Sequence, residues 1–504
     1  MSRATRRRLP SAAACLLASL AASAAPAMPA RVGESVAPRV IASHVRVCAN
    51  MNLYPRYNDI WGYTSPSGQE YALLGTVDGV SIVNITDRLH PHEVLFVNGP
   101  HSAWRDIKVY RDTMYIVNET DGGLQIVSLV DAEHPRPVAA YAAFRTAHNL
   151  YVEFENAALY VAGSNLGNGG VQILSLIDPQ RPRPAGSWDL QYAHDVYVRG
   201  DTMFVSAIRV ASLYIIDIST RHHPSMTIQG IISNYPYAAT HNCWVNDAGT
   251  HVITTDEIAG GIVRLWDITQ LPSSSLSGTY HPDDSASIPH NVLVDDGDLA
   301  YISHYTAGVR VVDVSNPSDP VEVAFYDTYP SSESGIFAGC WGVFPFYPNS
   351  PGLFVASDIQ TGLWVFELDR DLIDPSTRAR IVSAIRAARP AAAATRSGAA
   401  GPGERRSAGA AAMHVSAPAP NPLGPGARAR LDLALPTPAV VRADVVDAAG
   451  RLVRRLLDGT RGAGSTSIAW DGRDAQGDRA AAGVYFLRVS DGKTTQSRRV
   501  VVTQ

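Results

Sequence analysis

The sequence predicts an all-β protein, a seven-bladed β-propeller followed by a small Ig-like β-sandwich. Three observations indicate this fold class. A unit of about 46 residues recurs seven times between residues 46 and 370. Its segments are rich in Val, Ile and Tyr and either alternate between apolar and polar residues or run continuously apolar, as strands do. The 40 Gly and 33 Pro among the 504 residues supply turns between these strands.

The first thirty residues have the features of a secretory signal peptide. Arginines at positions 3 and 6–8 precede an apolar stretch over residues 12–22, and Ala22, Ser23 and Ala24 fit an A-x-A cleavage site. We therefore expect residues 1–30 to direct export to the extracellular space, the cell surface or the periplasm. No later apolar run reaches the ~18–20 residues of a membrane helix, so no membrane-spanning segment is expected.

Each repeat unit begins with a polar pair and continues through two strands to a Gly-led apolar run such as GVRVVDVS from Gly308. Four-stranded units of this kind pack radially as propeller blades. The pairs are Asn58-Asp59, Arg105-Asp106, His148-Asn149, His194-Asp195, His241-Asn242 and His290-Asn291, with Gly339-Cys340 in the last unit. We expect residues 45–51 to close the ring against the last blade. Cys48 would then approach the seventh blade, where it could form a disulfide with Cys340.

The composition changes sharply after the last repeat. Residues 371–414 consist largely of Ala, Arg, Gly and Pro, which predicts a disordered linker. Residues 415–504 again contain alternating segments with turn signals between them. Their predicted strands form the Ig-like sandwich and cover residues 431–435, 440–446, 466–470, 484–489 and 498–503.

Several long motifs of the repeat region resemble one family. They are WRDIKVYRDTMYIV from Trp104, THNCWV, PHNVLV, EVAFYDTYP from Glu322 and GVFPFYPNSPGLFVASDIQTGLWVF from Gly342. They resemble the choice-of-anchor B family, and the Gly-led runs are similar to its LVIVD repeats. The resemblance implies a secreted seven-bladed propeller whose C-terminal attachment module differs between members, and it implies no established reaction. Where relatives carry a longer acidic run, this chain has Asp256 and Glu257 followed by Ile258, which weakens a metal site built on that run.

The C-terminal region resembles two attachment modules. Asn421-Pro422, VDAAGR from Val446 and WDGRDAQGDRAAAGVYFLRV from Trp470 are similar to the Ig-like domain of the flagellar hook-capping protein and to type A sorting domains of type IX secretion. The resemblance implies anchoring or display at the cell surface, with the secretion machinery as a partner. Whether the domain is cleaved after export stays open.

The repeated histidines are candidate ligand-binding residues, because the first strand of each blade lines the central channel of a propeller. They are His148, His194, His241 and His290, with Asp256, Glu257, His304 and Asp358 on neighbouring strands that could reach the same mouth. Imidazole and carboxylate groups in a concave site suit a divalent metal or general acid–base chemistry, and the candidate metal ligands are His241, His290, Asp256 and Glu257. Repetition also fits a structural role in which each polar pair hydrogen-bonds adjacent blades, and we favour that role. Trp61, Trp104, Trp244 and Trp341 are interpreted as packing between blades rather than as a sugar platform.

The net charge and the catalytic motifs that are missing argue against several classes of function. A net charge of −5, with no basic tract beyond the N-terminal arginines, argues against nucleic acid as the main partner. No nucleophile elbow, Walker motif, H-E-x-x-H or C-x-x-C motif is present. The sequence therefore favours a non-enzymatic exported scaffold that binds a protein, glycan or envelope partner and is displayed through its C-terminal domain. The alternative is a lactonase- or esterase-like hydrolase with a divalent metal at the channel mouth, held by His241, His290, His304, Asp256 or Glu257.

Overall fold

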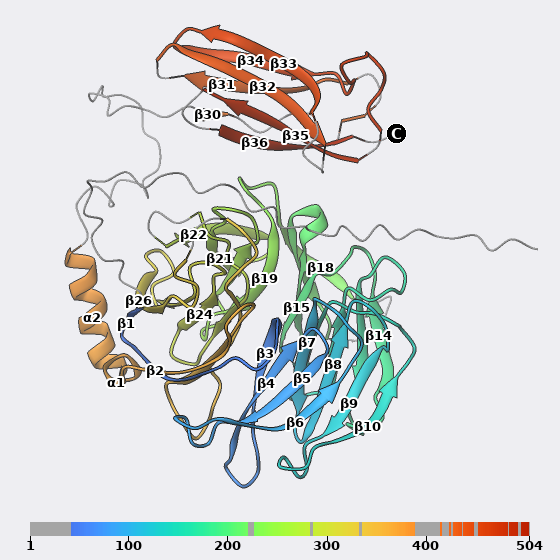
Figure 1. Cartoon of the computed structure of the whole chain (residues 1–504), viewed down its shortest axis with the longest axis vertical. Helices are drawn as coiled ribbons and strands as arrows, with labels where there is room; N and C mark the ends of the chain where they lie inside the picture. Colours follow the sequence, from blue (N-terminus) through green and yellow to red (C-terminus); the bar gives the residue numbers. More distant parts are fainter. Residues whose placement is uncertain are drawn as a thin grey trace, which may run out of the picture. The chain divides into compact units, whose positions relative to one another are not determined.

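The computed structural model describes two compact units (Figure 1), one within residues 1–393 and one within residues 394–504. The predicted signal peptide and residues 389–413 of the predicted linker lie outside the described residues. The described residues are 42–219, 226–282, 286–331, 335–388, 414–415, 423–424, 427–435, 437–447, 452–481, 483–491 and 495–502.

The first unit is a ring of seven antiparallel sheets, which confirms the predicted propeller. Consecutive strands pair within each blade, and the innermost strands of neighbouring blades lie side by side around the central channel. From the innermost strand outward, the blades are β3 (Tyr57–Thr64), β4 (Glu70–Thr76), β5 (Gly79–Asn84) and β6 (His92–Asn98); β7 (Arg105–Tyr110), β8 (Thr113–Asn118), β9 (Leu124–Ser128) and β10 (Arg136–Tyr141); β11 (Asn149–Glu153), β12 (Ala158–Ala162), β13 (Val171–Ser175) and β14 (Arg183–Trp188); β15 (Asp195–Arg199), β16 (Thr202–Ala207), β17 (Ser212–Asp217) and β18 (Thr227–Ile232); β19 (Thr240–Val245), β20 (His251–Asp256), β21 (Val263–Gln270) and β22 (Ser273–Tyr280); β23 (Val292–Val294), β24 (Leu299–Ser303), β25 (Val309–Asp313) and β26 (Val321–Tyr326); and β27 (Cys340–Phe344), β28 (Leu353–Asp358) and β29 (Gly362–Leu368).

An N-terminal strand completes the seventh blade. β2 (Val45–Met51) pairs antiparallel with β29, so the predicted ring closure is confirmed. The short strand β1 (Ala42–Ser43) adds a fifth strand to the sixth blade by pairing with β26. The start of the propeller therefore fastens two neighbouring blades at the point where the ring closes.

The same topology overturns the predicted Cys48–Cys340 disulfide. Cys48, Cys243 and Cys340 are free thiols. Cys48 lies on β2 and Cys340 on β27, which form opposite edges of the seventh blade with β29 and β28 between them. Since neighbouring strands lie ~4.8 Å apart, the two cysteines are separated by at least about 14 Å, too far for a disulfide.

The first part of the predicted linker (371–414) is helical, which corrects that prediction. The helices are α1 (Arg370–Ile373) and α2 (Pro375–Ala388). The carboxylate of Asp374 accepts a hydrogen bond from the backbone N–H of Thr377 at 2.8 Å, as an N-cap residue does. α2 also begins with a proline, whose fixed φ favours the first helical turn.

These helices pack on the propeller (Figure 1), where α2 lies beside β26. Leu372 and Val382 are buried in a core cluster shared with the sixth and seventh blades. The Arg378 guanidinium contacts the Asp313 carboxylate at 3.1 Å, and both side chains are at least nine-tenths buried. Burial of apolar and paired charged groups therefore fixes a segment whose composition alone indicates disorder.

The second unit is a β-sandwich with its own core, as predicted. One sheet contains β30 (His414–Val415), β31 (Ala429–Leu435) and β34 (Gly464–Trp470). The other contains β33 (Leu452–Arg461), β32 (Ala439–Asp447), β35 (Gly483–Ser490) and β36 (Thr495–Val502). Trp470 is fully buried between them among aliphatic side chains. In the described part of the chain, no helix has both the length and the apolar character needed to cross a bilayer.

Candidate functional site

The innermost strands line the channel in layers, because alternate side chains of a strand point to opposite faces. On β11, Leu150 packs in the core between blades, whereas Asn149 and Tyr151 line the channel. The same alternation holds on the other inner strands. It produces a polar layer of Asn and Asp side chains in the middle of the channel and an aromatic layer at one end. The histidines, each one residue before such an Asn or Asp, line the other end.

The four repeated histidines form one continuous row on four successive blades. The centroids of their rings are 4.0 Å apart for His148 and His194, 4.4 Å for His194 and His241, and 4.3 Å for His241 and His290. The indole of Trp341 continues the row at 5.0 Å from His290. The structure thus brings together the four histidines that the repeat places at strand starts.

Glu257 faces this row from the loop after β20. Its carboxylate lies 3.7 Å from Nε2 of His241 and 3.7 Å from Nε2 of His290. It also accepts a hydrogen bond of 2.8 Å from the Tyr305 hydroxyl. Nδ1 of His148 lies 2.6 Å from a carboxylate oxygen of Glu119. The histidine end therefore combines imidazoles with a buried carboxylate, the chemistry that the sequence predicts there.

Burial controls the protonation of this layer. It lowers the pKa of His241 and of His290 to about 3, and it holds the pKa of His194 well below its usual range. Burial would also lower the pKa of His148, but the hydrogen bond with Glu119 outweighs it, so the net shift is upward. Burial raises the pKa of Glu257. Three of the four imidazoles are accordingly neutral at pH 7 and keep a lone pair for a ligand.

The second residue of each repeated pair links adjacent blades. The Asp195 carboxylate accepts hydrogen bonds from the side-chain amides of Asn149, at 3.0 Å, and Asn242, at 2.9 Å. The Asp106 carboxylate accepts one from the backbone N–H of Leu150 at 2.5 Å. These contacts bear out the favoured structural role for the Asn and Asp members of the pairs.

Three other predicted residues do not join the histidine row. Asp256 forms a buried ion pair with Arg264 and accepts the backbone N–H of Ala239 at 2.6 Å. Nδ1 of His304 lies 2.8 Å from the Ser287 hydroxyl. Asp358 accepts the Thr328 hydroxyl at 2.7 Å and two backbone N–H groups of its own turn. Their carboxylates and imidazole hold loops in place, so Glu257 alone of this acidic group reaches the row.

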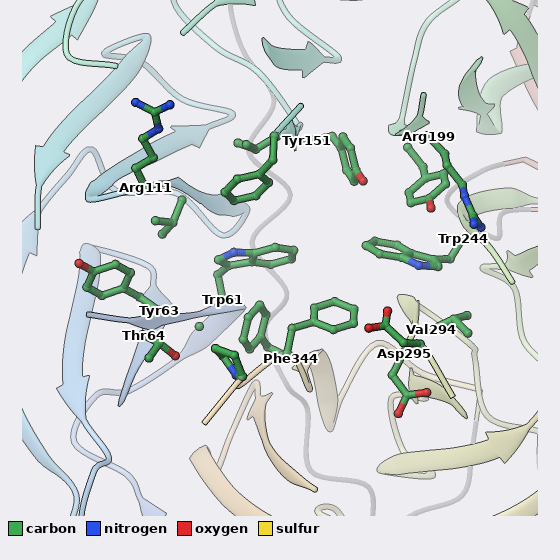
Figure 2. A pocket seen from close by; sticks show the side chains of 18 of the residues that line it. Trp61, Tyr63, Thr64, Arg111, Tyr151, Arg199, Trp244, Val294, Asp295 and Phe344 are labelled. Atoms are coloured by element: carbon green, nitrogen blue, oxygen red, sulfur yellow. The ribbon is translucent and has the colours of Figure 1, made fainter. Parts of the chain in front are cut away.

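The opposite end of the channel opens into a cavity of about 680 Å³ that the sequence interpretation missed (Figure 2). Figure 2 shows Trp61, Tyr151, Trp244 and Phe344 around its open space. Neighbouring rings form a nearly continuous belt, with centroids 4.8 Å apart for Trp61 and Phe344, 5.2 Å for Tyr151 and Tyr197, and 4.5 Å for Tyr197 and Trp244. Trp61 and Trp244 do pack between blades, as predicted, but they also form the wall of this cavity.

The rim of the cavity is charged and comes from the turns between first and second strands. Asp247 and Asp296 present carboxylates without a hydrogen-bond partner among the described residues, and Arg111 lies on the same rim, across the cavity from Asp295 (Figure 2). Arg199, from the Arg199-Gly200-Asp201 tripeptide, donates hydrogen bonds to backbone carbonyls of the next blade. It pairs with Thr202 in the hairpin of β15 and β16, which confirms the turn interpretation of that tripeptide.

A signal for this cavity is present in the sequence. The aromatic wall comes from the fourth position counted from the start of each unit, which places it two residues beyond the blade-linking Asn or Asp. The residues at this position are Trp61, Lys108, Tyr151, Tyr197, Trp244, Leu293 and Gly342, and Phe344 joins the wall from two residues further along the last unit. Comparison of the seven units column by column would have found this aromatic layer at the level opposite the histidines.

Two known protein families match parts of the chain. The LVIVD repeat matches residues 191–229 and 291–328, in the fourth and sixth blades. The FlgD Ig-like domain matches residues 420–495, in the C-terminal sandwich. The chain therefore carries LVIVD repeats and a FlgD Ig-like domain, as the sequence motifs predict.

The solved structures to which the chain is similar have low sequence identity to it, and no curated protein sequence matches the chain. PorZ, an essential bacterial surface component of the type-IX secretion system of Porphyromonas gingivalis, is 14% identical with a TM-score of 0.45, and the match covers 91% of this chain and 61% of PorZ. The chain thus spans about three fifths of the length of PorZ. The Cps50 (Swd1) β-propeller domain of Myceliophteria thermophila is 12% identical with a TM-score of 0.46, covering 64% of this chain and 98% of that domain. A protein from Lactobacillus plantarum is 12% identical with a TM-score of 0.46, covering 60% of this chain and 88% of that one.

Proposed function

We propose that this chain is an exported, non-enzymatic binding propeller that captures a saccharide in the aromatic cavity and is displayed at the cell surface through its C-terminal Ig-like domain. The observation that carries the proposal is the cavity of about 680 Å³ walled by aromatic rings from several blades. This volume falls within the range of ~300–1,000 Å³ typical of small-molecule sites.

The lining favours a saccharide as the occupant. Sugar rings have apolar C–H faces that pack on aromatic rings, and hydroxyl edges that need hydrogen-bond partners. Trp61, Trp244 and Tyr197 supply aromatic surface, while the carboxylates of Asp247 and Asp296 remain available to accept hydroxyl groups. A purely apolar ligand would leave these rim carboxylates without a role.

Surface display has separate support. The N-terminal thirty residues have the composition of a signal peptide, and a FlgD Ig-like domain follows the propeller. A propeller is a rigid platform, so attachment through a second domain would present the cavity without using its surface.

The binding proposal is tested by titrating the full chain with maltotriose, cellotriose and chitotriose, following tryptophan fluorescence and heat of binding. We expect one of these probes to bind, and Trp244→Ala and Phe154→Ala each to weaken binding at least about tenfold. Phe154 lines the cavity but is 60% exposed, so its removal should not affect folding.

Trp104→Ala is the matched control, because Trp104 lies at the histidine end of the channel. The affinity of the Trp104→Ala variant for the saccharide probe should equal that of the unmodified protein. Failure of all three probes to bind would refute the saccharide assignment, and equal losses in Trp104→Ala and Trp244→Ala would refute the location.

The alternative of a metal-dependent hydrolase has less support. Two of the residues that would hold its metal, Asp256 and His304, are engaged by Arg264 and Ser287. The binding proposal uses side chains that have no other hydrogen-bonding role.

A further inference from the structure

We propose that the histidine end of the channel binds a single transition-metal dication such as Zn²⁺ through His194, His241 and Glu257. This site is separate from the aromatic cavity and does not depend on the saccharide proposal. The ligand set also differs from the one that the sequence predicts, since it contains His194 in place of His290 and lacks Asp256.

The positions of the donor atoms suit one ion. One nitrogen each of His194 and His241 and one carboxylate oxygen of Glu257 all lie within 4.8 Å of one another. Zinc ligands at ~2.0–2.2 Å from the metal in tetrahedral geometry are about 3.4 Å apart. Side-chain shifts of roughly 1 Å would therefore bring the three donors to bonding distance. Three protein ligands leave a fourth position for water.

Among the described residues, no side chain is hydrogen-bonded to either imidazole. Nδ1 of His194 and Nδ1 of His241 are buried and have no hydrogen-bond partner among the described residues. Nε2 of His241 points to the Glu257 carboxylate, at 3.7 Å. A bound dication would compensate the negative charge of the Glu257 carboxylate, which has no cationic side chain beside it among the described residues.

Neighbouring groups hold the ligands in orientation. The Tyr305 hydroxyl donates a hydrogen bond to Glu257, and Tyr305 has a positive φ of 34°, an uncommon backbone conformation that concentrates at functional sites. His290 is oriented by its contact of 2.5 Å with the Trp341 carbonyl and flanks the site on one side. His148, held by Glu119, flanks it on the other. Such outer contacts are typical of metal centres, where they fix the tautomer and the direction of each ligand.

The available space indicates an ion rather than an organic ligand. The cavity beside the row has a volume of about 30 Å³, enough for one water or one metal ion. Two imidazoles and one carboxylate suit Zn²⁺, Cu²⁺ or Ni²⁺, whereas Ca²⁺ and Mg²⁺ prefer sites made of oxygen ligands.

The test uses the full chain, purified without a histidine tag and stripped with a chelator. Titration calorimetry with ZnCl₂ should give one site with submicromolar Kd, and CaCl₂ should give no binding at the same concentrations. His241→Ala and Glu257→Gln should each weaken zinc binding about 100-fold or more. Glu257→Gln keeps an oxygen that can accept the Tyr305 hydrogen bond, so it separates loss of the metal from loss of the fold.

His134→Ala is the matched control, because His134 pairs with Asp131 on the surface, where both side chains are mostly exposed. It should bind zinc like the unmodified protein. If His241→Ala unfolds, as judged by circular dichroism, Glu257→Gln and His194→Asn decide the question. Absence of a stoichiometric zinc site, or equal affinity in Glu257→Gln and the unmodified protein, would overturn the proposal. A loss of saccharide binding with zinc binding retained would refute the proposed function and leave this inference standing.

Discussion

Between the two ends of the channel, one buried lysine faces two buried carboxylates. Lys108 Nζ lies 2.5 Å from Asp106 and 3.7 Å from Asp59, and all three side chains are at least nine-tenths buried. Burial would lower the pKa of Lys108, but the two carboxylates outweigh it and raise that pKa. A single ammonium cannot balance two carboxylates. Asp106 is closer, so Asp59 is the group for which protonation relieves the excess charge.

We predict that Asp59→Asn makes the protein more stable than the unmodified chain at pH 8, and that this advantage is much smaller at pH 5. Burial raises the pKa of Asp59 well above its usual value, so the folded state keeps a proton that the unfolded chain releases above about pH 4. Its contribution to stability is complete below that pH and decreases as the pH rises toward the raised pKa. Asn cannot ionise, so the variant does not lose stability in this way. The difference in free energy of unfolding between the variant and the unmodified protein should therefore grow by up to about 1.4 kcal/mol per pH unit. Urea unfolding at pH 5, 6, 7 and 8 measures it.

Lys108→Met is the counterpart of this prediction. The buried Asp106 carboxylate would lose its cation, so the free energy of unfolding, measured with urea, should fall by about 3–5 kcal/mol at pH 7. For the Asp59 prediction, the contrary outcome is a free energy of unfolding that changes with pH in the same way in Asp59→Asn and in the unmodified protein. That outcome would show that Asp59 is ionised in the folded state.

Residue types alone did not reveal which side chains line the histidine end of the channel and which line the aromatic cavity. The repeat placed the histidines correctly, because a fixed position at the start of an inner strand must recur at one level of the channel. Asp256 looked equivalent to Glu257 in sequence, but the buried Arg264 on the next strand, β21, pairs with Asp256 and keeps its carboxylate out of the histidine row. The aromatic wall was misjudged, since the same tryptophan can pack between blades on one edge and face a cavity on the other.

At the scale of elements, the blades were predictable and the helices were not. Strand patterns repeat seven times, so local ambiguity in one unit is resolved by the others. α2 occurs once, in a segment rich in Ala and Arg. Its N-cap Asp374, the following proline and the apolar residues Ile381, Val382 and Ile385 formed a helical signal, but the composition of the whole segment obscured it.

We predict that α2 contributes directly to propeller stability. Val382→Ala removes two buried methyl groups and should lower the free energy of unfolding by about 1–3 kcal/mol. Arg378→Met leaves Asp313 buried without its cation and should cost about 3–5 kcal/mol. Ser383→Ala, on the exposed face of the same helix, is the control and should change stability by less than about 0.5 kcal/mol. Thermal unfolding of the full chain distinguishes these outcomes, and unchanged melting of Arg378→Met would mean that the helix docks only loosely.

At the scale of the whole molecule, the two units have separate cores. The sandwich core is formed entirely by residues between 415 and 502, and the clusters of the propeller draw on residues no later than Ile385. Nothing in either core depends on the other, so each unit can keep its fold when the other is removed. Binding and display are therefore expected to be separable.

We predict that a chain ending at residue 393 keeps the affinity of the full chain for zinc and for the bound saccharide but loses retention at the cell surface. The helix α2 is preserved in this truncation, so the propeller keeps its packing partner. In the native host, the truncated protein should move from the envelope fraction to the periplasm or medium, as measured by immunoblotting of the fractions. Fusing residues 394–504 to an unrelated exported reporter should transfer retention to that reporter. Equal envelope retention of the full and truncated chains would mean that the propeller itself binds the surface, and the sandwich would then need a role other than display.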